Sequence, residues 1–222
     1  VSKKPMPYPG WLNPIAQAVV SAGVAVAFGG DFSTTAFAAV VGVLVGALDQ
    51  RLLNRPEARR SMFVFAALGT SLLAILGGAF MPIAPQVVVL AGLIVLFPGF
   101  TLTTAVAELA TGNLTAGTAR LMAAALVLLQ LGIGAALSTR LAEAVGLATA
   151  GQALAAPSRA LEAVALTLSA LGLALLLKVP RRLLGATLAA ATAGTLGTWA
   201  GVYLFGPALG AIGGAFAATF VS

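Results

Sequence analysis

The sequence predicts an all-α integral membrane protein, and three observations carry this prediction. Of the 222 residues, 60% are hydrophobic and only 8% are Asp, Glu, Lys or Arg, whereas about 25% of a typical soluble domain is charged. Several uncharged stretches reach the roughly 20 residues that a helix needs to cross a bilayer. A soluble fold of this size could not cover its surface with so few charges. Disordered chains and coiled coils need more polar or charged residues and are excluded as well.

Two residue types are absent from the sequence, and their absence excludes several kinds of site. The chain has no Cys and no His, so it lacks thiolates, disulfides and the most common general base and metal ligand. No Walker motif and no nucleophile–base pair is visible. We therefore expect neither an enzyme nor a bound metal or cofactor. The net charge of +6 comes from twelve basic residues scattered between apolar runs, which is typical of topology signals, and we expect no nucleic-acid partner.

Helix breakers divide the apolar stretches into about eight transmembrane segments. Two prolines interrupt Met81–Gln86, and Gly206-Pro207 interrupts the last stretch, because proline stops a helix. The predicted segments are Trp11–Gly30, Thr34–Leu53, Ser61–Phe80, Val87–Phe97, Thr115–Thr139, Ser158–Leu177, Leu183–Phe205 and Pro207–Ser222. Val87–Phe97 is too short to span alone, so it must continue past Pro98-Gly99 as a broken helix.

The basic residues predict the orientation. With the N-terminus in the cytoplasm, ten basic residues fall on the inner side and two, Arg140 and Arg159, on the outer side. This is a strong positive-inside bias. The inner residues are Lys3, Lys4, Arg51, Arg55, Arg59, Arg60, Arg120, Lys178, Arg181 and Arg182.

A weak internal similarity predicts two related modules. Ser21–Asp31 and Ser169–Pro180 each end a long apolar helix with a tight polar break before a Gly/Ala-rich helix. If these helices correspond, the repeat has five spans and its two copies enter the membrane in opposite directions, as in many secondary transporters. Residues 1–145 would form the first module, and residues 146–222 would begin a second that lacks its last two spans. Trivial similarity between low-complexity helices is the alternative.

The break at Pro98-Gly99 is the most informative feature for function. Freed backbone groups at membrane depth must lie against protein or water, so a broken helix predicts a cavity. We expect Gly99 to supply unusual backbone dihedrals. The helix that begins near Thr101 presents unpaired N–H groups, which suit a carboxylate such as that of an amino acid. Thr101, Thr104 and Glu108 share one face of that helix, where they could hold an ammonium group or carry a proton.

Each of these residues has a simpler interpretation. Glu108 would lie at the cytoplasmic surface and pair with Arg120, and the threonines would bond their own helix carbonyls. Asp31, the other candidate for proton coupling, would cap the next helix. Gln130 and the pair Thr70-Ser71 lie within segments, where they would bind a substrate or bond a neighbouring helix.

The same stretch resembles the threonine/serine exporter family of bacteria. The similar residues are Phe97-Pro98-Gly99 with Thr101 and Thr103, Glu108-Leu-Ala-Thr-Gly112-Asn113, and Gly117-Thr-Ala-Arg120. Phe28–Asp31 looks like the end of the family's first helix, and Val179–Arg182 looks like the opening of its second module. With this resemblance the expected substrate-binding residues are Pro98, Gly99, Thr101, Thr104, Glu108 and Asn113, and the expected proton-coupling residues are Glu108 and Asp31.

The resemblance implies a ten-span unit that exports threonine and serine across the bacterial inner membrane and draws on the proton motive force rather than ATP. Two departures stand out. The family's acidic position is more often Asp, whereas here it is Glu108, and the final two spans are missing. The alternative is a non-transporting subunit or scaffold. Expected partners are small amino acids, protons and the lipid bilayer, together with a second copy of the chain or a second membrane subunit.

Overall fold

The computed structural model of the chain describes residues 9, 11–52, 56–146, 157–206, 214–215 and 217–218. All regular structure in these residues is helical. The eight α-helices are α1 (Leu12–Ala27), α2 (Phe32–Leu52), α3 (Pro56–Phe80), α4 (Pro85–Leu93), α5 (Gly99–Ala110), α6 (Leu114–Ala144), α7 (Arg159–Leu176) and α8 (Leu184–Phe205). Two short 3-10 helices, η1 (Ile94–Leu96) and η2 (Arg181–Leu183), follow α4 and precede α8.

The helix lengths confirm the predicted membrane class. By length and composition α2, α3, α6, α7 and α8 can each cross a bilayer, and the bent pair formed by α4–η1 and α5 makes a sixth candidate. Helix α1 has 16 residues and is shorter than a standard span. Seven of the predicted segments therefore correspond to helices in the structure. The predicted segment Pro207–Ser222 lies outside the described residues, apart from positions 214–215 and 217–218.

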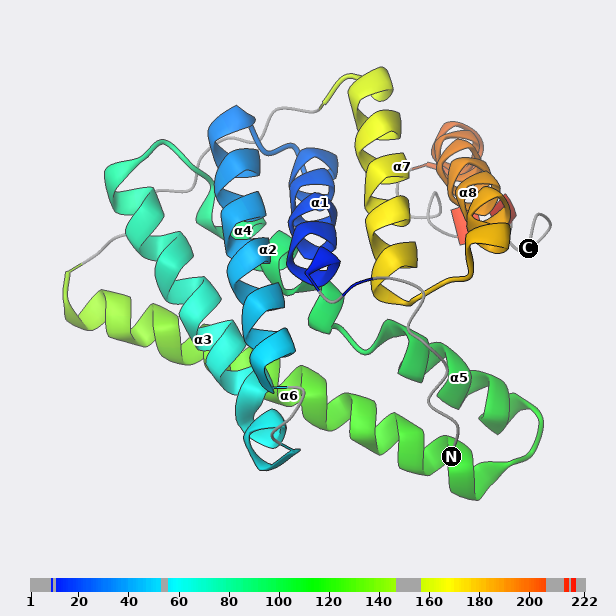
Figure 1. Cartoon of the computed structure of the whole chain (residues 1–222), viewed down its shortest axis with the longest axis horizontal. Coiled ribbons are helices and arrows are strands. Elements are labelled where there is room, and N and C mark those ends of the chain that lie inside the picture. Colours follow the sequence, from blue (N-terminus) through cyan, green and yellow to red (C-terminus); the bar gives the residue numbers. More distant parts are fainter. Residues whose placement is uncertain are drawn as a thin grey trace.

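The short helix α4 occupies the middle of the bundle, where it packs against α1, α2 and α3 (Figure 1). Its fully buried residues Val87, Val88 and Ala91 belong to the two main core clusters. Small residues bring the surrounding helices close together. A Cβ added at Gly42 of α2 would lie 2.6 Å from the Ser21 Oγ of α1. Such glycine contacts are a common way for helices to pack in membranes.

Helices α1 and α7 lie side by side although they come from the two predicted modules (Figure 1). Gly23 faces Ala165 and Ser169, while Gly172 faces Ala16 and Val20. Early residues of one helix thus meet late residues of the other, so the two helices run antiparallel. This is the relative direction that an inverted repeat requires. The repeat itself stays a prediction.

Several helix ends lie at one edge of the molecule. Figure 1 shows the α1–α2 turn, the α3–α4 loop and the start of α7 along the upper edge, whereas the end of α2 lies lower and the α7–α8 turn lies at mid-height, above α5. Helix α5 packs mainly against α6. Together α5 and the first half of α6 form a hairpin that projects from the bundle at the lower right.

Candidate functional site

The predicted break at Pro98 is present and bends the chain sharply. Phe97 is extended, with ψ 130°, and Pro98 stands at the N-cap position of α5 with ψ 45°. The axes of α4–η1 and α5 differ by 56°. Two backbone N–H groups at the break have local acceptors. Gly99 N–H donates to Phe97 O at 2.9 Å, and Leu102 N–H donates to Pro98 O at 2.9 Å.

One expectation for the break was wrong. Gly99 is the first residue of α5 and is not among the glycines with positive φ, so it supplies no left-handed conformation, and the bend comes from Phe97 and Pro98. The cavity expected at the break stays a prediction. Three cavities among the described residues, of about 440, 290 and 140 Å³, are lined by residues other than Pro98, Gly99 and the predicted polar face of α5.

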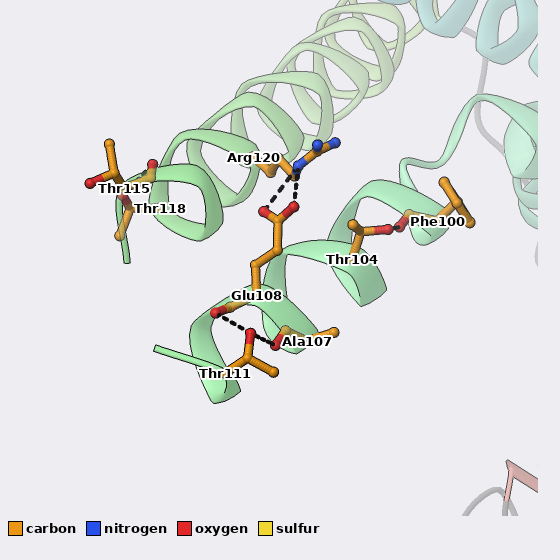
Figure 2. A network of polar contacts seen from close by, with 8 residues as sticks. All are labelled: Phe100, Thr104, Ala107, Glu108, Thr111, Thr115, Thr118 and Arg120. Carbon is orange, nitrogen blue, oxygen red and sulfur yellow. Dashed lines mark hydrogen bonds and ion pairs between the residues drawn. The ribbon is translucent and has the colours of Figure 1, made fainter. Parts of the chain in front are cut away.

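Two of the three threonines of α5 bond their own helix. The Thr104 hydroxyl donates to Phe100 O at 2.8 Å (Figure 2). The Thr103 hydroxyl donates to Gly99 O at 3.0 Å. The hydroxyl proton of Thr104 is therefore used, and its oxygen remains as an acceptor. Thr101 and Thr104 are both half-buried. Only the acceptor side of the Thr104 hydroxyl is thus available to a ligand.

Glu108 and Arg120 form an ion pair between α5 and α6. The Arg120 Nε lies 3.0 Å from each carboxylate oxygen of Glu108 (Figure 2). The Glu108 side chain is 22% exposed and that of Arg120 is 51% exposed. The hairpin is closed next to this pair by Leu109, whose side chain lies where a Cβ on Gly117 would be. The pairing of Glu108 with Arg120 was the simpler of the two interpretations of this acid.

The turn between α5 and α6 places Asn113 beside Glu108. Gly112 has a φ of +83°, a left-handed conformation that glycine adopts readily. Asn113 N–H then donates to Glu108 O at 2.9 Å, closing the C-terminus of α5. The Asn113 side chain is exposed and makes no capping hydrogen bond to α6. The structure thus brings Glu108, Asn113 and Arg120 together, with Thr104 one turn away.

Asp31 belongs to the α1–α2 turn, which lies at the upper edge of the molecule in Figure 1, away from the α5–α6 hairpin at the lower right. Its Oδ1 accepts a hydrogen bond of 2.9 Å from Thr34 N–H, which makes it the N-cap of α2. Hydrogen bonds from the side chain and the backbone of Thr34 hold the pKa of the Asp31 carboxyl below its usual range. Thr34 in turn accepts from Ala84 N–H at 3.0 Å. Asp31 therefore helps to fix the α3–α4 loop against α2.

The interior also holds polar side chains with no hydrogen-bond partner in the described structure. The buried unpaired atoms are Gln17 Nε2, Ser21 Oγ, Thr70 Oγ1, Ser71 Oγ and Gln130 Oε1. Gln17 is not among the residues predicted from the sequence. A polar residue within an apolar segment is the signal that could have identified it. No group of three or more Asp or Glu in the described part of the chain could hold a metal ion.

Comparison with known proteins identifies the family. Residues 1–142 match the model of a family, ThrE, described as "Putative threonine/serine exporter". The matched range ends near the end of α6 and contains the broken helix, the ion pair and Asp31. No curated protein and no solved structure matches the chain. Because the family match covers more than half of the 222 residues, the protein belongs to the threonine/serine exporter family.

Proposed function

We propose that this protein is a secondary transporter that exports threonine and serine from the cytoplasm and is driven by the proton motive force. The observation that carries the proposal is the ion pair between Glu108 and Arg120, which closes a helical hairpin directly after a broken helix. Ionisable residues of this kind in transporters commonly bind substrates or carry protons. The family match supports amino acids as the substrates.

An amino acid is a zwitterion and complements both members of the pair. Its ammonium group would replace Arg120 at the Glu108 carboxylate, and its carboxylate would take the guanidinium of Arg120. The Thr104 oxygen, one turn from Glu108, supplies an acceptor for the ammonium or for the substrate hydroxyl. Thr101 and Asn113 flank this position, and Pro98 and Gly99 set the direction of α5. We therefore assign substrate binding to this end of the hairpin.

Proton coupling needs a group whose charge changes during the cycle, and we assign that role to Glu108. Protonation would remove the negative charge that holds Arg120 and would release the hairpin. Asp31 was the second candidate. Its capping hydrogen bonds lower its pKa, which favours a carboxylate that stays ionised at neutral pH. We therefore assign a structural role to Asp31, which holds the α1–α2 turn in place.

Threonine efflux tests the proposal. Cells that express the chain are loaded with a threonine dipeptide, and efflux is compared for wild type and Glu108→Gln, with and without an uncoupler. The matched control is Glu143→Gln, because Glu143 also pairs with an arginine, Arg140, at 3.2 Å. We expect uncoupler-sensitive efflux in wild type and in the control, and its loss in Glu108→Gln. Efflux that persists in Glu108→Gln at equal membrane levels would contradict the proposed site.

A subunit that works only with a partner is the second candidate, and α8 favours it. Only Gly201 is buried along this helix, although α8 has 22 residues. A second copy or a second membrane subunit could cover it. Reconstitution of the purified chain alone in proteoliposomes decides the question. Threonine transport by these vesicles would exclude the need for another protein, whereas transport that appears only with a co-expressed membrane partner would establish it.

A further inference from the structure

The cavity of about 440 Å³ lies between α3, α4 and α6, at the end of α4 opposite the Pro98 break. Its walls include Ile75 and Leu90, which are apolar, together with the polar residues Ser71, Gln86, Ser138 and Thr139. No lining residue is acidic. With about 1.5 Å of rise per residue, the eight residues from Leu90, the last lining residue of α4, to Pro98 separate the cavity from the break by roughly 12 Å.

The hydroxyl groups that line the cavity differ in their hydrogen bonds. The hydroxyls of Ser138 and Thr139 donate to Ala135 O at 2.7 Å and 2.9 Å, so their protons are used. Ser71 is 3% exposed, and its Oγ has no hydrogen-bond partner. Among the hydroxyl groups of the cavity, that of Ser71 is therefore the free donor, and an unpaired buried donor is costly.

The N-terminus of α4 supplies the second set of donors. Pro85 at the first position has no N–H, and the Gln86 N–H has no acceptor among the described residues, whereas Val87 N–H and Val88 N–H both donate to Ala84 O. The start of a helix also carries a partial positive charge. Ser71 and the first turn of α4 thus present hydrogen-bond donors and positive potential to one cavity, and this combination selects an anion that accepts hydrogen bonds.

We propose that this cavity binds the carboxylate of a small amino acid, through the Ser71 hydroxyl and the N-terminal turn of α4. The inference rests on the proposed function, because that function supplies the ligand class. Ile75 and Leu90 give the ligand's side chain an apolar wall, and the volume suits a small molecule. The chain then has two substrate positions, one at the cavity beside the N-terminus of α4 and one at the ion pair between α5 and α6.

Binding of radiolabelled threonine to the purified full chain in detergent tests this inference. The measurements use the Glu108→Gln background, so that the proposed site at the hairpin does not contribute. Unlabelled threonine and threoninol, which lacks the carboxylate, serve as competitors. The test variants are Ser71→Ala and Ala135→Leu, which fills the cavity. The control is Thr70→Ala, because Thr70 is also buried and unpaired on α3 but does not line this cavity.

We expect threonine to compete at least tenfold better than threoninol. Ser71→Ala should weaken threonine binding about tenfold, as expected for the loss of one hydrogen bond to a charged group, and should leave threoninol binding unchanged. Ala135→Leu should abolish binding. Thr70→Ala should leave the competition by threonine and by threoninol unchanged. Equal effects of Ser71→Ala and Thr70→Ala, or equal competition by threonine and threoninol, would overturn the inference.

Three further outcomes separate the hypotheses. Competition by glycerol phosphate, an anionic lipid headgroup, that is stronger than competition by threonine would assign the cavity to lipid and overturn the amino-acid site. Wild-type efflux that depends on Glu108, combined with no threonine binding in the Glu108→Gln background, would overturn the cavity site alone. Absence of both efflux and binding would overturn the proposed function as well.

Discussion

The Thr34 hydroxyl oxygen accepts a hydrogen bond of 3.0 Å from Ala84 N–H, across 50 positions of the sequence. Both residues are buried. The contact ties the α1–α2 turn to the loop that precedes α4, and Asp31 supports it by accepting from Thr34 N–H. A polar contact of one side chain therefore helps, together with the packing of α4 against α1, α2 and α3, to position the N-terminus of α4 and the cavity beside it.

Thr34→Val should destabilise the protein more than its small change in shape suggests. Valine fills the same space but leaves the buried Ala84 N–H without an acceptor, which costs about 1–3 kcal/mol. The thermal midpoint of the purified protein measures the loss. Thr35→Val is the control, because the Thr35 hydroxyl makes only a long contact of 3.5 Å to Gly30 O. Thr34→Ser should restore most of the stability, and equal midpoints for both valine variants would contradict this role.

Asp31→Ala should lower stability in a pH-dependent way. The folded pKa of Asp31 lies below its reference value of 3.8, so the ionised carboxylate stabilises the folded state above that pH, and the gain is lost as the pH falls through the folded pKa. The loss at pH 7 should be about 1 kcal/mol, typical of a helix cap, and should shrink below about pH 4. Melting curves at pH 7, 5 and 3.5 check this. A difference that stays constant down to pH 3.5 would show that the charge is irrelevant.

Two glycines of α6 should respond oppositely to alanine. A Cβ at Gly134 would lie 2.5 Å from Val64 O and 2.6 Å from the Ala67 Cβ of α3, whereas a Cβ at Gly132 would meet nothing within 4 Å. Gly134→Ala should therefore cost about 1–3 kcal/mol through overpacking. Gly132→Ala should leave the stability unchanged or raise it by up to about 1 kcal/mol, because alanine favours the helix. Denaturation in mild detergent compares them, and similar effects would argue against the close α3–α6 contact.

Arg120→Gln should separate the function of the ion pair from its structural role. The Arg120 side chain is 51% exposed, and exposed ion pairs contribute about 0–1 kcal/mol to stability. The thermal midpoint should change little, while threonine efflux should fall as it does in Glu108→Gln. A large drop in the thermal midpoint with unchanged efflux per folded molecule would instead show that the ion pair serves stability and not transport.

The helices and the break could be predicted from the sequence because proline, glycine and apolar length act locally. Pro98 bends the chain as expected, and the segment Ser61–Phe80 matches most of α3. The partners of Glu108 could be predicted only as alternatives, since hairpin geometry decides whether Arg120 comes within reach. The structure shows that it does.

The large cavity could not be predicted from the sequence. It depends on how three helices cross, and the sequence places Ser71 and Gln86 in separate segments with no common motif. The break at Pro98 also predicts a cavity, and that cavity stays a prediction. Sequence reasoning could not foresee that the Phe97 and Pro98 carbonyls would accept the neighbouring N–H groups.

The contact between α1 and α7 has a consequence for how the gene could be divided. Gly23 of α1 packs against α7, and Gly172 of α7 packs against α1. The small side chains around these glycines are buried. This interface joins the two predicted halves independently of the connection between α6 and α7. Two polypeptides produced separately, one ending after α6 and one beginning before α7, would carry matching surfaces and reassemble in the bilayer without a covalent link.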